Sequence, residues 1–544
     1  YLDRNGIMCD NDMQRHSFRF QFQQRAINDR LRIGLAGSAT LTDSHVPNGD
    51  NFVLAYSMLP VYPVYNADGS YFTKVNAEYD QGNPVQNQNL NERKNSNVYF
   101  YGAGDIQFEI INGLNIKANL YKSRFSNEYS RYDDSRTTVG QGNNGFAQKR
   151  NRAWDRNLME WTLDYNKSFG ADEKHKLNAI LGYSWEDNTY SYFFAQNRNF
   201  LINDLSYNAL QSGAGLKTGD VESGKNYYKL ISMFARAHYS YDERYMITAT
   251  VRRDGSSKFG ANHKWGTFPS VSAAWGISQE AFMQDVNWIN DLKLRAGYGV
   301  TGNQDGLQPY KSMELYGMSG IYYDNGNWAT SYKISQNANP DLKWEKTGQF
   351  DVGFEIGFWQ NRLSFDVAYY NKKTTDLLLD CPIPHTTGFT TVYKNIGSVR
   401  NQGMDLMISA RPVQTQDFNW SSTINLNFNK NKILQLGDNN EDIEMNSWVG
   451  GSESILRVGE NMSSFYGYRR LGVYTEEDFN NGLCEKNQIG RAKRTDKKEI
   501  IGKGMPDWTG SWINNFSYKN FDLTMDLQFV WGVETMQQFY HSTY

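Results

Sequence analysis

Residues 346–358 read Lys-Thr-Gly-Gln-Phe-Asp-Val-Gly-Phe-Glu-Ile-Gly-Phe, in which apolar residues alternate with polar residues or glycine. Successive side chains of a β-strand point to opposite faces of the sheet. Phe350 and Phe354 therefore share one face, whereas Asp351 and Glu355 lie on the other. The stretch predicts a strand with one apolar and one polar face.

The same alternation recurs along the chain, and the connections between the alternating segments change regularly in length. Residues 359–361 form a short turn to the next such segment, whereas residues 432–507 form the longest loop. The expected strands are 16–27, 30–42, 96–110, 113–127, 155–168, 174–189, 226–241, 244–254, 266–277, 290–300, 346–358, 362–373, 399–411, 417–430, 508–518 and 521–531. The predicted fold is all-β: a transmembrane antiparallel up-and-down β-barrel with about sixteen strands here, short periplasmic turns and long extracellular loops.

The composition is polar on average but rich in aromatic residues. Of 544 residues, 39% are hydrophobic and 15% are aromatic, and the mean hydropathy is −0.69. No stretch approaches the roughly 18 consecutive apolar residues of a membrane helix. A barrel explains this composition, because only every second strand residue meets lipid and aromatic side chains form girdles at the membrane interfaces. The alternative is a large secreted β-rich protein, such as an adhesin.

Charge and cysteine content exclude several other classes of protein. The chain has 56 Lys and Arg against 59 Asp and Glu, so it lacks the basic excess that nucleic-acid binding needs. Cys9, Cys381 and Cys484 are too few and too scattered for a metal cluster or a disulfide framework, which favours isolated thiols over a single pairing.

Motifs of the common hydrolases and metalloenzymes are absent from the sequence. The seven His are isolated, and no His-Glu-x-x-His, Gly-x-Ser-x-Gly or Gly-Lys-Ser/Thr pattern occurs. Asp438, Glu441, Asp442 and Glu444 form an acidic cluster, but it lacks the ligand spacing and the glycine of a calcium loop. We therefore expect neither an enzyme nor a cofactor; calcium in the loops is not indicated.

Several segments between residues 252 and 403 go beyond the pattern of alternation. They are 252–260 (Arg-Arg-Asp-Gly-Ser-Ser-Lys-Phe-Gly), 265–270 (Trp-Gly-Thr-Phe-Pro-Ser), 273–275 (Ala-Ala-Trp), 292–304 (Leu-Lys-Leu-Arg-Ala-Gly-Tyr-Gly-Val-Thr-Gly-Asn-Gln), 339–345 (Asn-Pro-Asp-Leu-Lys-Trp-Glu) and 395–403 (Asn-Ile-Gly-Ser-Val-Arg-Asn-Gln-Gly). In their order and spacing, these segments resemble the signatures of the SusC-like (SusC/RagA) TonB-dependent transporters of Bacteroidota outer membranes.

The resemblance implies a larger protein than this chain. Members of that family have a barrel of about 22 strands with a plugged lumen. We therefore expect residues 1–544 to be a fragment of one β-barrel domain, with the signal peptide, the plug domain and the last strands absent. A closed sixteen-strand channel is the structural alternative.

The resemblance also implies a function in the outer membrane. It implies TonB-dependent uptake of oligosaccharides together with a SusD-like surface lipoprotein, with the TonB complex acting through the missing N-terminal part. Membrane lipids would surround the barrel, and a dimer of SusC–SusD pairs is a further implied assembly. An oligopeptide importer of the same family, a passive porin-like channel and an adhesin without transport remain open.

Aromatic residues in the long loops are the candidate cargo contacts. Tyr322, Tyr323 and Trp328 lie in the loop 301–345, and Trp448 lies in the largest loop. Aromatic faces that pack on sugar rings beside amides and carboxylates would form an oligosaccharide site. The alternative is that these rings pack within their own loops or against a partner protein.

Charged residues at one strand end form a second group of candidates. Arg252 and Arg253 precede Asp254-Gly255, so they are either strand-end charges before a turn or a charged lining of the translocation path. Asn339-Pro340-Asp341 is expected to set a turn. Trp344, close to the start of the following strand, is expected to be an interfacial girdle residue.

Overall fold

The computed structural model describes residues 1–47, 50–73, 82–384, 386, 388–389, 391–447 and 451–536. The chain divides into two compact units. The first comprises Tyr1–Asp164 and Leu181–Met233, and the second comprises Tyr165–Ile180 and Phe234–Tyr544.

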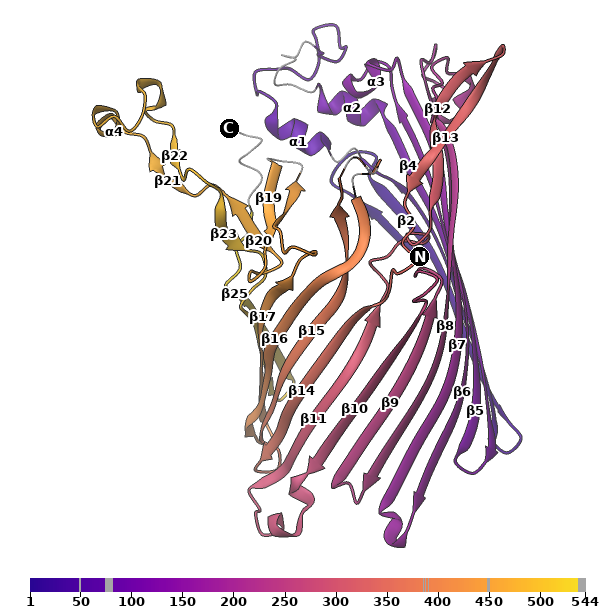
Figure 1. The fold of residues 1–544 in the computed structure, drawn as a ribbon, viewed down its shortest axis with the longest axis vertical. Helices are drawn as coiled ribbons and strands as arrows, with labels where there is room; N and C mark the ends of the chain where they lie inside the picture. The colour runs from indigo at the N-terminus through magenta and orange to yellow at the C-terminus, as the bar shows by residue number, and fades with distance from the viewer. Residues whose placement is uncertain are drawn as a thin grey trace. The chain divides into compact units, whose positions relative to one another are not determined.

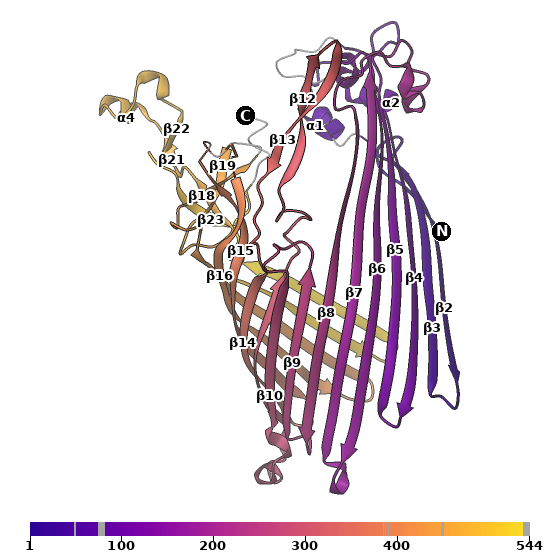
Figure 2. The same cartoon turned by 45° about the vertical axis from the view of Figure 1, so that its right-hand side comes forward.

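Long antiparallel strands make up most of the first unit. They are β1 (Leu2–Asn5), β2 (Asp12–Ala26), β3 (Leu31–His45), β4 (Glu92–Ile111) and β5 (Leu114–Asp133), together with the greater parts of β6 (Phe146–Phe169), β7 (His175–Arg198) and β8 (Val221–Tyr241). From β1 to β5 each strand pairs with the next one in an antiparallel register. These strands can be followed side by side in Figure 2.

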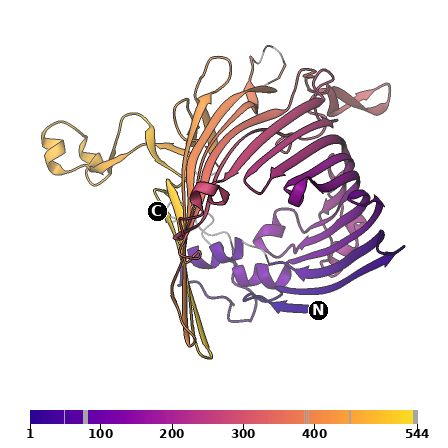
Figure 3. The ribbon, with the colours of Figure 1, turned by 90° about the horizontal axis from the view of Figure 1, so that it is seen from below.

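The second unit contains a ladder of nine strands that also pair in antiparallel order. They are β9 (Tyr245–Ser256), β10 (Trp265–Gly276), β11 (Ile289–Asn303), β14 (Glu345–Phe358), β15 (Leu363–Pro382), β16 (Thr391–Gln414), β17 (Phe418–Gln435), β24 (Trp508–Tyr518) and β25 (Phe521–Trp531). Figure 1 labels these strands except β24, and Figure 3 shows the ladder from below, coloured from magenta to yellow.

Each of the sixteen expected strands coincides with an observed strand, and several observed strands are longer. The segment expected at 155–168 belongs to β6, which begins at Phe146, and the segment expected at 174–189 belongs to β7, which ends at Arg198. The β6 extension has polar residues on both faces and the β7 extension has aromatic residues on both faces, so neither shows the alternation of apolar and polar residues. The length of a strand beyond its apolar band is therefore not predictable from alternation.

The two faces of the strands differ as expected. On the apolar face, Phe350, Phe354, Leu523 and Leu527 are 46%, 42%, 63% and 46% exposed. Their large exposed side chains are not part of a compact interior. This exposure agrees with a face that meets lipid.

Several of the short turns use backbone conformations with positive φ. Trp359, Gln360 and Asn361 have φ values of 50°, 60° and 59°, and the turn after β2 contains the same left-handed conformation at Asn28 and Asp29. Tight hairpin turns favour this conformation because it matches the right-handed twist of the strands. Asn and Asp tolerate it better than other residues with a side chain.

The long loops contain additional secondary structure that alternation does not predict. The second unit has the hairpin β12 (Leu315–Asp324) and β13 (Asn327–Gln336), the small sheet β18 (Ile443–Ser447), β19 (Gly451–Leu456), β20 (Ser464–Gly467) and β23 (Glu499–Lys503), and the pair β21 (Arg470–Val473) and β22 (Ala492–Arg494). The helices are α1 (Asp50–Ser57), α2 (Pro84–Leu90), α3 (Thr138–Gln141) and α4 (Glu476–Asn480), with short 3₁₀ turns at Ala171–Glu173, Ser206–Asn208, Leu210–Ser212, Ile277–Gln279, Ala281–Met283 and Lys486–Gln488. Among the described helices, all are too short or too polar to cross a membrane.

Candidate functional site

The hairpin β12–β13 carries three of the predicted cargo contacts. Tyr323 pairs with Trp328 in the register of the two strands, and their ring centroids are 5.1 Å apart in an edge-to-face arrangement. Tyr322 is adjacent to Tyr323 and so lies on the opposite face of the hairpin. Tyr322, Tyr323 and Trp328 are 50%, 63% and 70% exposed, so all three are accessible to a ligand or a partner.

The rest of the hairpin is also apolar and exposed, and it forms a sheet of only two strands. Its other large exposed side chains are Tyr316, Met318, Ile321, Tyr332 and Ile334. A two-stranded hairpin is marginally stable alone in water. Contiguous exposed apolar surface of this kind marks an interaction site.

A buried aromatic cluster at the strand ends anchors the loop that carries the hairpin. Phe259, Phe268 and Trp344 are 1%, 6% and 4% exposed. The ring of Trp344 lies 4.6 Å from Phe259 and 5.5 Å from Phe268, and its Nε1 donates a 3.0 Å hydrogen bond to the Lys264 carbonyl oxygen. The prediction that Trp344 is an interfacial girdle residue is wrong, because its ring packs inside this cluster.

Asparagine side chains complete this anchor, which we call the junction. Asn339 Oδ1 accepts a hydrogen bond from the Asp341 backbone N–H, and this contact confirms the predicted turn. Asn395 Nδ2 donates to the carbonyl oxygens of Lys343 and Asp376 at 2.7 and 2.8 Å. Four of the six segments that resemble a known family, 252–260, 265–270, 339–345 and 395–403, therefore meet at the junction, where they hold the ends of the loop.

The two predicted arginines lie on opposite faces of β9. Arg252 Nε donates to Asp254 at 2.8 Å on the polar face, and the Arg252 guanidinium lies 5.6 Å from the ring of Phe234. The Arg253 guanidinium lies 5.5 Å from the ring of Trp265, and Arg253 shares the apolar face with Val251. Because adjacent strand residues alternate, only Arg252 faces the polar side. Trp448, the remaining predicted contact, lies outside the described residues.

A network of charged residues crosses the polar face of the second unit. Arg295 on β11 pairs with Glu355 on β14 and, at 2.7 Å, with Asp366 on β15, and Lys293 lies 3.8 Å from Glu355. All four side chains are about one-third exposed. Such a network would be costly against lipid, whereas a hydrated or protein-filled lumen accommodates it.

The same polar face is hollowed beside the network. A cavity of about 540 Å³ is lined by polar residues that include Asp366, Asp405, Asn427 and Gln528. Asn425 Nδ2 donates a 3.1 Å hydrogen bond to Ser511 Oγ across β17 and β24, next to this cavity. The wall thus offers donors and acceptors to a polar ligand or a polar protein segment.

Aromatic residues gather on the polar face of the first unit, and sequence reasoning missed them. The ring centroids of Phe125 and Trp154 are 5.4 Å apart, those of Trp154 and Tyr190 are 4.9 Å apart, and those of Tyr190 and Tyr192 are 5.9 Å apart. Trp154 is 41% exposed. Trp154, Tyr190 and Tyr192 lie just outside the predicted strands 155–168 and 174–189, so alternation gave no signal for them. In the structure, lipid-facing residues of β6, such as Trp161, have the opposite parity to Trp154.

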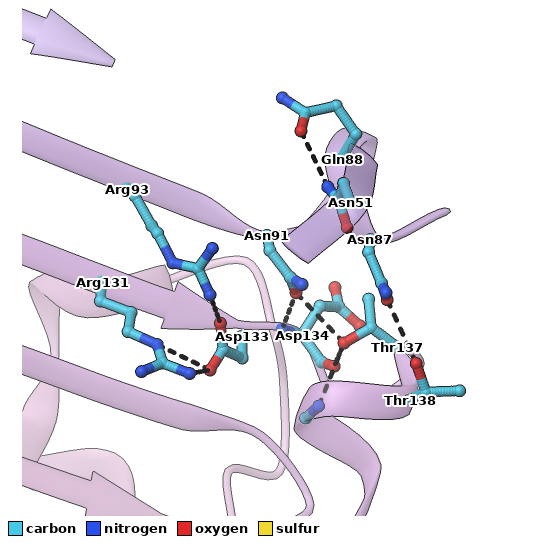
Figure 4. A network of polar contacts seen from close by, with 11 residues as sticks. Asn51, Asn87, Gln88, Asn91, Arg93, Arg131, Asp133, Asp134, Thr137 and Thr138 are labelled. Atoms are coloured by element: carbon cyan, nitrogen blue, oxygen red, sulfur yellow. Dashed lines mark hydrogen bonds and ion pairs between the residues drawn. The ribbon is translucent and has the colours of Figure 1, made fainter. Parts of the chain in front are cut away.

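The loops of the first unit are tied down by a buried polar network (Figure 4). Asp133, 1% exposed, accepts hydrogen bonds from Arg93 at 3.3 Å and from Arg131 at 2.8 Å. Asn91 Oδ1, at the end of α2, accepts from the Asp134 backbone N–H and, at 3.1 Å, from Thr137 Oγ1. These hydrogen bonds tie the ends of β4 and β5 to α2 and α3, although Asn87 Nδ2 and Asn91 Nδ2 are buried without a partner among the described residues.

A second buried carboxylate closes the loop between β7 and β8. Asp220 is 3% exposed and accepts hydrogen bonds from Arg198 Nη1 at 2.7 Å and Gln196 Nε2 at 2.8 Å. Burial alone would raise the pKa of Asp220, but the hydrogen bonds from Arg198, Gln196 and the Lys217 backbone outweigh burial and lower it to about 2. The carboxylate is therefore charged at any physiological pH.

The acidic cluster of the largest loop is neutralised by basic residues. Asp442 pairs with Arg457 at 2.7 Å, Asp438 lies 3.7 Å from Lys394, and Glu444 lies 3.8 Å from Lys498. Within the part of the chain that the structure describes, no three His, Cys, Asp or Glu side chains gather as metal ligands.

The three cysteines form no disulfide in the structure. Cys9, Cys381 and Cys484 are all free thiols. Cys9 is exposed, Cys381 is buried and Cys484 is intermediate.

Comparison with known proteins gives one consistent result. A family model described as TonB dependent receptor-like, beta-barrel matches residues 37–542. TonB-dependent receptor P3 of Formosa agariphila is 32% identical, and the match covers 98% of this chain and 55% of that protein. TonB-dependent receptor SusC of Bacteroides thetaiotaomicron is 28% identical over 97% of this chain and 55% of its own length.

Solved structures agree with the sequence matches. The RagAB peptide transporter is similar with a TM-score of 0.77 and 25% identity, over 96% of this chain and 58% of that chain. The chain thus spans about half the length of the curated relatives it matches. Together the comparisons confirm the expected antiparallel β-barrel class and the expected resemblance to SusC-like receptors.

Proposed function

Because this chain belongs to the TonB dependent receptor-like β-barrel family, whose barrels lie in the outer membrane, we propose that it forms the wall of an oligosaccharide importer. The observation that carries the proposal is the division of the strands into an exposed apolar face and a polar face with the Arg295–Glu355–Asp366 network. A wall of this kind encloses a hydrated path through lipid. Transport then depends on TonB acting through a further domain of the whole protein.

The β12–β13 hairpin is the proposed contact with a SusD-like surface lipoprotein. Its aromatic and aliphatic side chains are exposed on both faces, and the junction holds the ends of its loop. Tyr and Trp are enriched at protein interfaces, where one large rigid ring covers much area. In this arrangement Tyr322, Tyr323 and Trp328 contact either the lipoprotein or the cargo that it delivers.

Growth on defined nutrients tests the proposal. Deletion of the gene should abolish growth on one class of oligosaccharide, and a plasmid copy should restore growth only in cells that have TonB. Growth that persists without TonB would instead indicate a passive channel. A lipoprotein that co-purifies with the receptor would identify the partner.

Peptide import is the second candidate. The observation in its favour is the similarity to the RagAB peptide transporter at a TM-score of 0.77. The same deletion strain distinguishes the two, because a peptide importer would leave growth on every oligosaccharide unchanged and reduce growth on oligopeptides.

A further inference from the structure

The polar face of β5, β6 and β7 carries two arginines that lack a carboxylate partner. Arg150 and Arg152 lie two residues apart on β6, so they point to the same face, and neither forms an ion pair with any described residue. Two other arginines of β6 and β7 differ in this respect: Arg156, on the same face, pairs with Glu186 at 3.0 Å, and Arg198 pairs with Asp220. No carboxylate among the described residues therefore balances the positive charges of Arg150 and Arg152.

Both guanidinium groups also contain a donor that no acceptor satisfies. Arg150 Nε and Arg152 Nε are buried and lack a hydrogen-bond partner. A buried donor without an acceptor is costly, and a bound water, ion or ligand group can supply the missing acceptor.

Aromatic rings lie beside Arg150 on the same face. The Arg150 guanidinium lies 4.9 Å from the centre of the Tyr129 ring, and the Trp154 and Tyr190 rings continue the same surface. On the opposite face of β6 at this level are polar side chains, and Asp155 there pairs with Arg124 at 3.2 Å. This stretch of wall therefore stands outside the apolar band, where a hydrated ligand can reach it.

We propose that Arg150, Arg152, Trp154 and Tyr190 form a binding site for an acidic oligosaccharide, one whose sugar rings carry carboxylate or sulfate groups. The arginines bind the anionic groups, since guanidinium pairs well with planar carboxylates and with sulfate-like anions. The aromatic rings pack against the apolar faces of the sugar rings. The inference rests on the proposed oligosaccharide uptake and specifies the class of cargo.

The sheet geometry favours a sugar over an extended peptide at this site. A common way to bind a peptide is to add it as a strand to an exposed sheet edge. β5, β6 and β7 belong to one sheet and are followed by further strands, so the site lies on a sheet face rather than at an edge. Side chains alone make the contacts, which suits a ligand recognised by its ring faces and charges.

Calorimetric titration of the purified full-length receptor tests the site, with tetragalacturonate as the acidic probe and maltotetraose as a neutral probe of equal length. Tetragalacturonate should bind more tightly, and the preference should shrink at high salt because salt screens the charges. The double variant Arg150→Gln/Arg152→Gln should weaken tetragalacturonate binding about tenfold or more, since hydrogen bonds to charged groups contribute over 1.4 kcal/mol each. Maltotetraose binding should change less than twofold.

Two further variants separate charge from structure. Arg124→Gln removes an arginine from the other face of the neighbouring strand and should leave both affinities unchanged. Trp154→Ala should weaken both probes. Unchanged thermal unfolding in each variant shows that the receptor still folds.

Three outcomes would overturn the inference. Equal binding of both probes to the unaltered receptor would overturn it, as would a double variant that keeps its preference for tetragalacturonate. Tighter binding of tetraglutamate than of tetragalacturonate, lost in the double variant, would assign the site to peptides. If instead deletion of the gene leaves growth on all oligosaccharides intact, the proposed function itself fails, which is a separate result.

Discussion

Because one face of each strand is apolar and the other polar, we expect a charged substitution at adjacent positions of one strand to change stability very differently. Ile408 and Met407 are neighbours on β16. Ile408 lies opposite Phe365 and Ile424 on the apolar face, whereas Met407 lies opposite Asp366 on the polar face. We expect Ile408→Arg to be strongly destabilising and Met407→Arg to be nearly neutral.

The magnitude follows from the depth of Ile408. A strand tilted by about 40° rises roughly 2.6 Å per residue along the barrel axis, so a band of about 25 Å takes about ten residues. Ile408 is four residues from Met404, where the apolar side of β16 begins, and six from Gln414, where the strand ends. It therefore lies near the middle of the band. Arginine there costs about 2–4 kcal/mol, or roughly 30- to 700-fold in the folding equilibrium.

Unfolding of the full-length receptor by urea in lipid vesicles measures both effects. Ile408→Arg should lower the free energy of unfolding by the stated amount, and Met407→Arg should change it by less than about 0.5 kcal/mol. Met407 is 42% exposed, and the new guanidinium would meet the carboxylates of Asp366 and Asp405. Equal losses in the two variants, or no loss in Ile408→Arg, would refute the assignment of the faces.

Three other perturbations give distinct outcomes. Folding lowers the pKa of Asp220 from 3.8 to about 2, so the ionised carboxylate stabilises the folded loop. This stabilisation is fully present above the pKa of the unfolded chain and is lost as the pH falls towards 2. Pepsin should therefore cut the loop 199–220 slowly at about pH 4 and faster near pH 2, and Asp220→Asn should remove this dependence. Tyr323→Ala/Trp328→Ala should leave thermal unfolding unchanged, since both rings are exposed, while reducing recovery of the partner lipoprotein; unchanged recovery would exclude the hairpin as its contact. Iodoacetamide should alkylate Cys9 before Cys381, because Cys9 is exposed and Cys381 is buried; equal rates would contradict the structure.

Sequence alternation predicted the strands because the physical constraint is local. Residues two apart on a strand share a face, so Phe350 and Phe354 reveal their environment without any knowledge of the fold. The same rule separates Arg252 from Arg253, although charge alone made them look like one group. It does not reach Trp154, Tyr190 and Tyr192, which lie in the extensions of β6 and β7 beyond the predicted strands. The two-residue periodicity does not apply to the loops, so it predicts nothing about the orientation of their side chains.

The packing of the junction could not be predicted from hydrophobic alternation. Phe259 and Trp344 pack together although 84 residues lie between them in the sequence. The residues around each of them do not alternate between apolar and polar. The contact depends on the paths of the loop after β9 and the loop before β14, and these paths are set by the tertiary structure. Trp344 therefore looked like a membrane-interface residue when judged by its local surroundings.

The junction also explains why the segments that reveal the family say little about the cargo. A Cβ atom on Gly260 would lie 1.9 Å from the Pro340 carbonyl oxygen, so the backbone of one segment touches the backbone of the other. Phe259 and Leu342 are buried beside this contact, at 1% and 0% exposure. Residues that are fixed by such packing cannot adapt to a ligand. Specificity must then come from side chains that the fold leaves free on the polar face, such as Arg150 and Arg152, which a match to the shared segments does not predict.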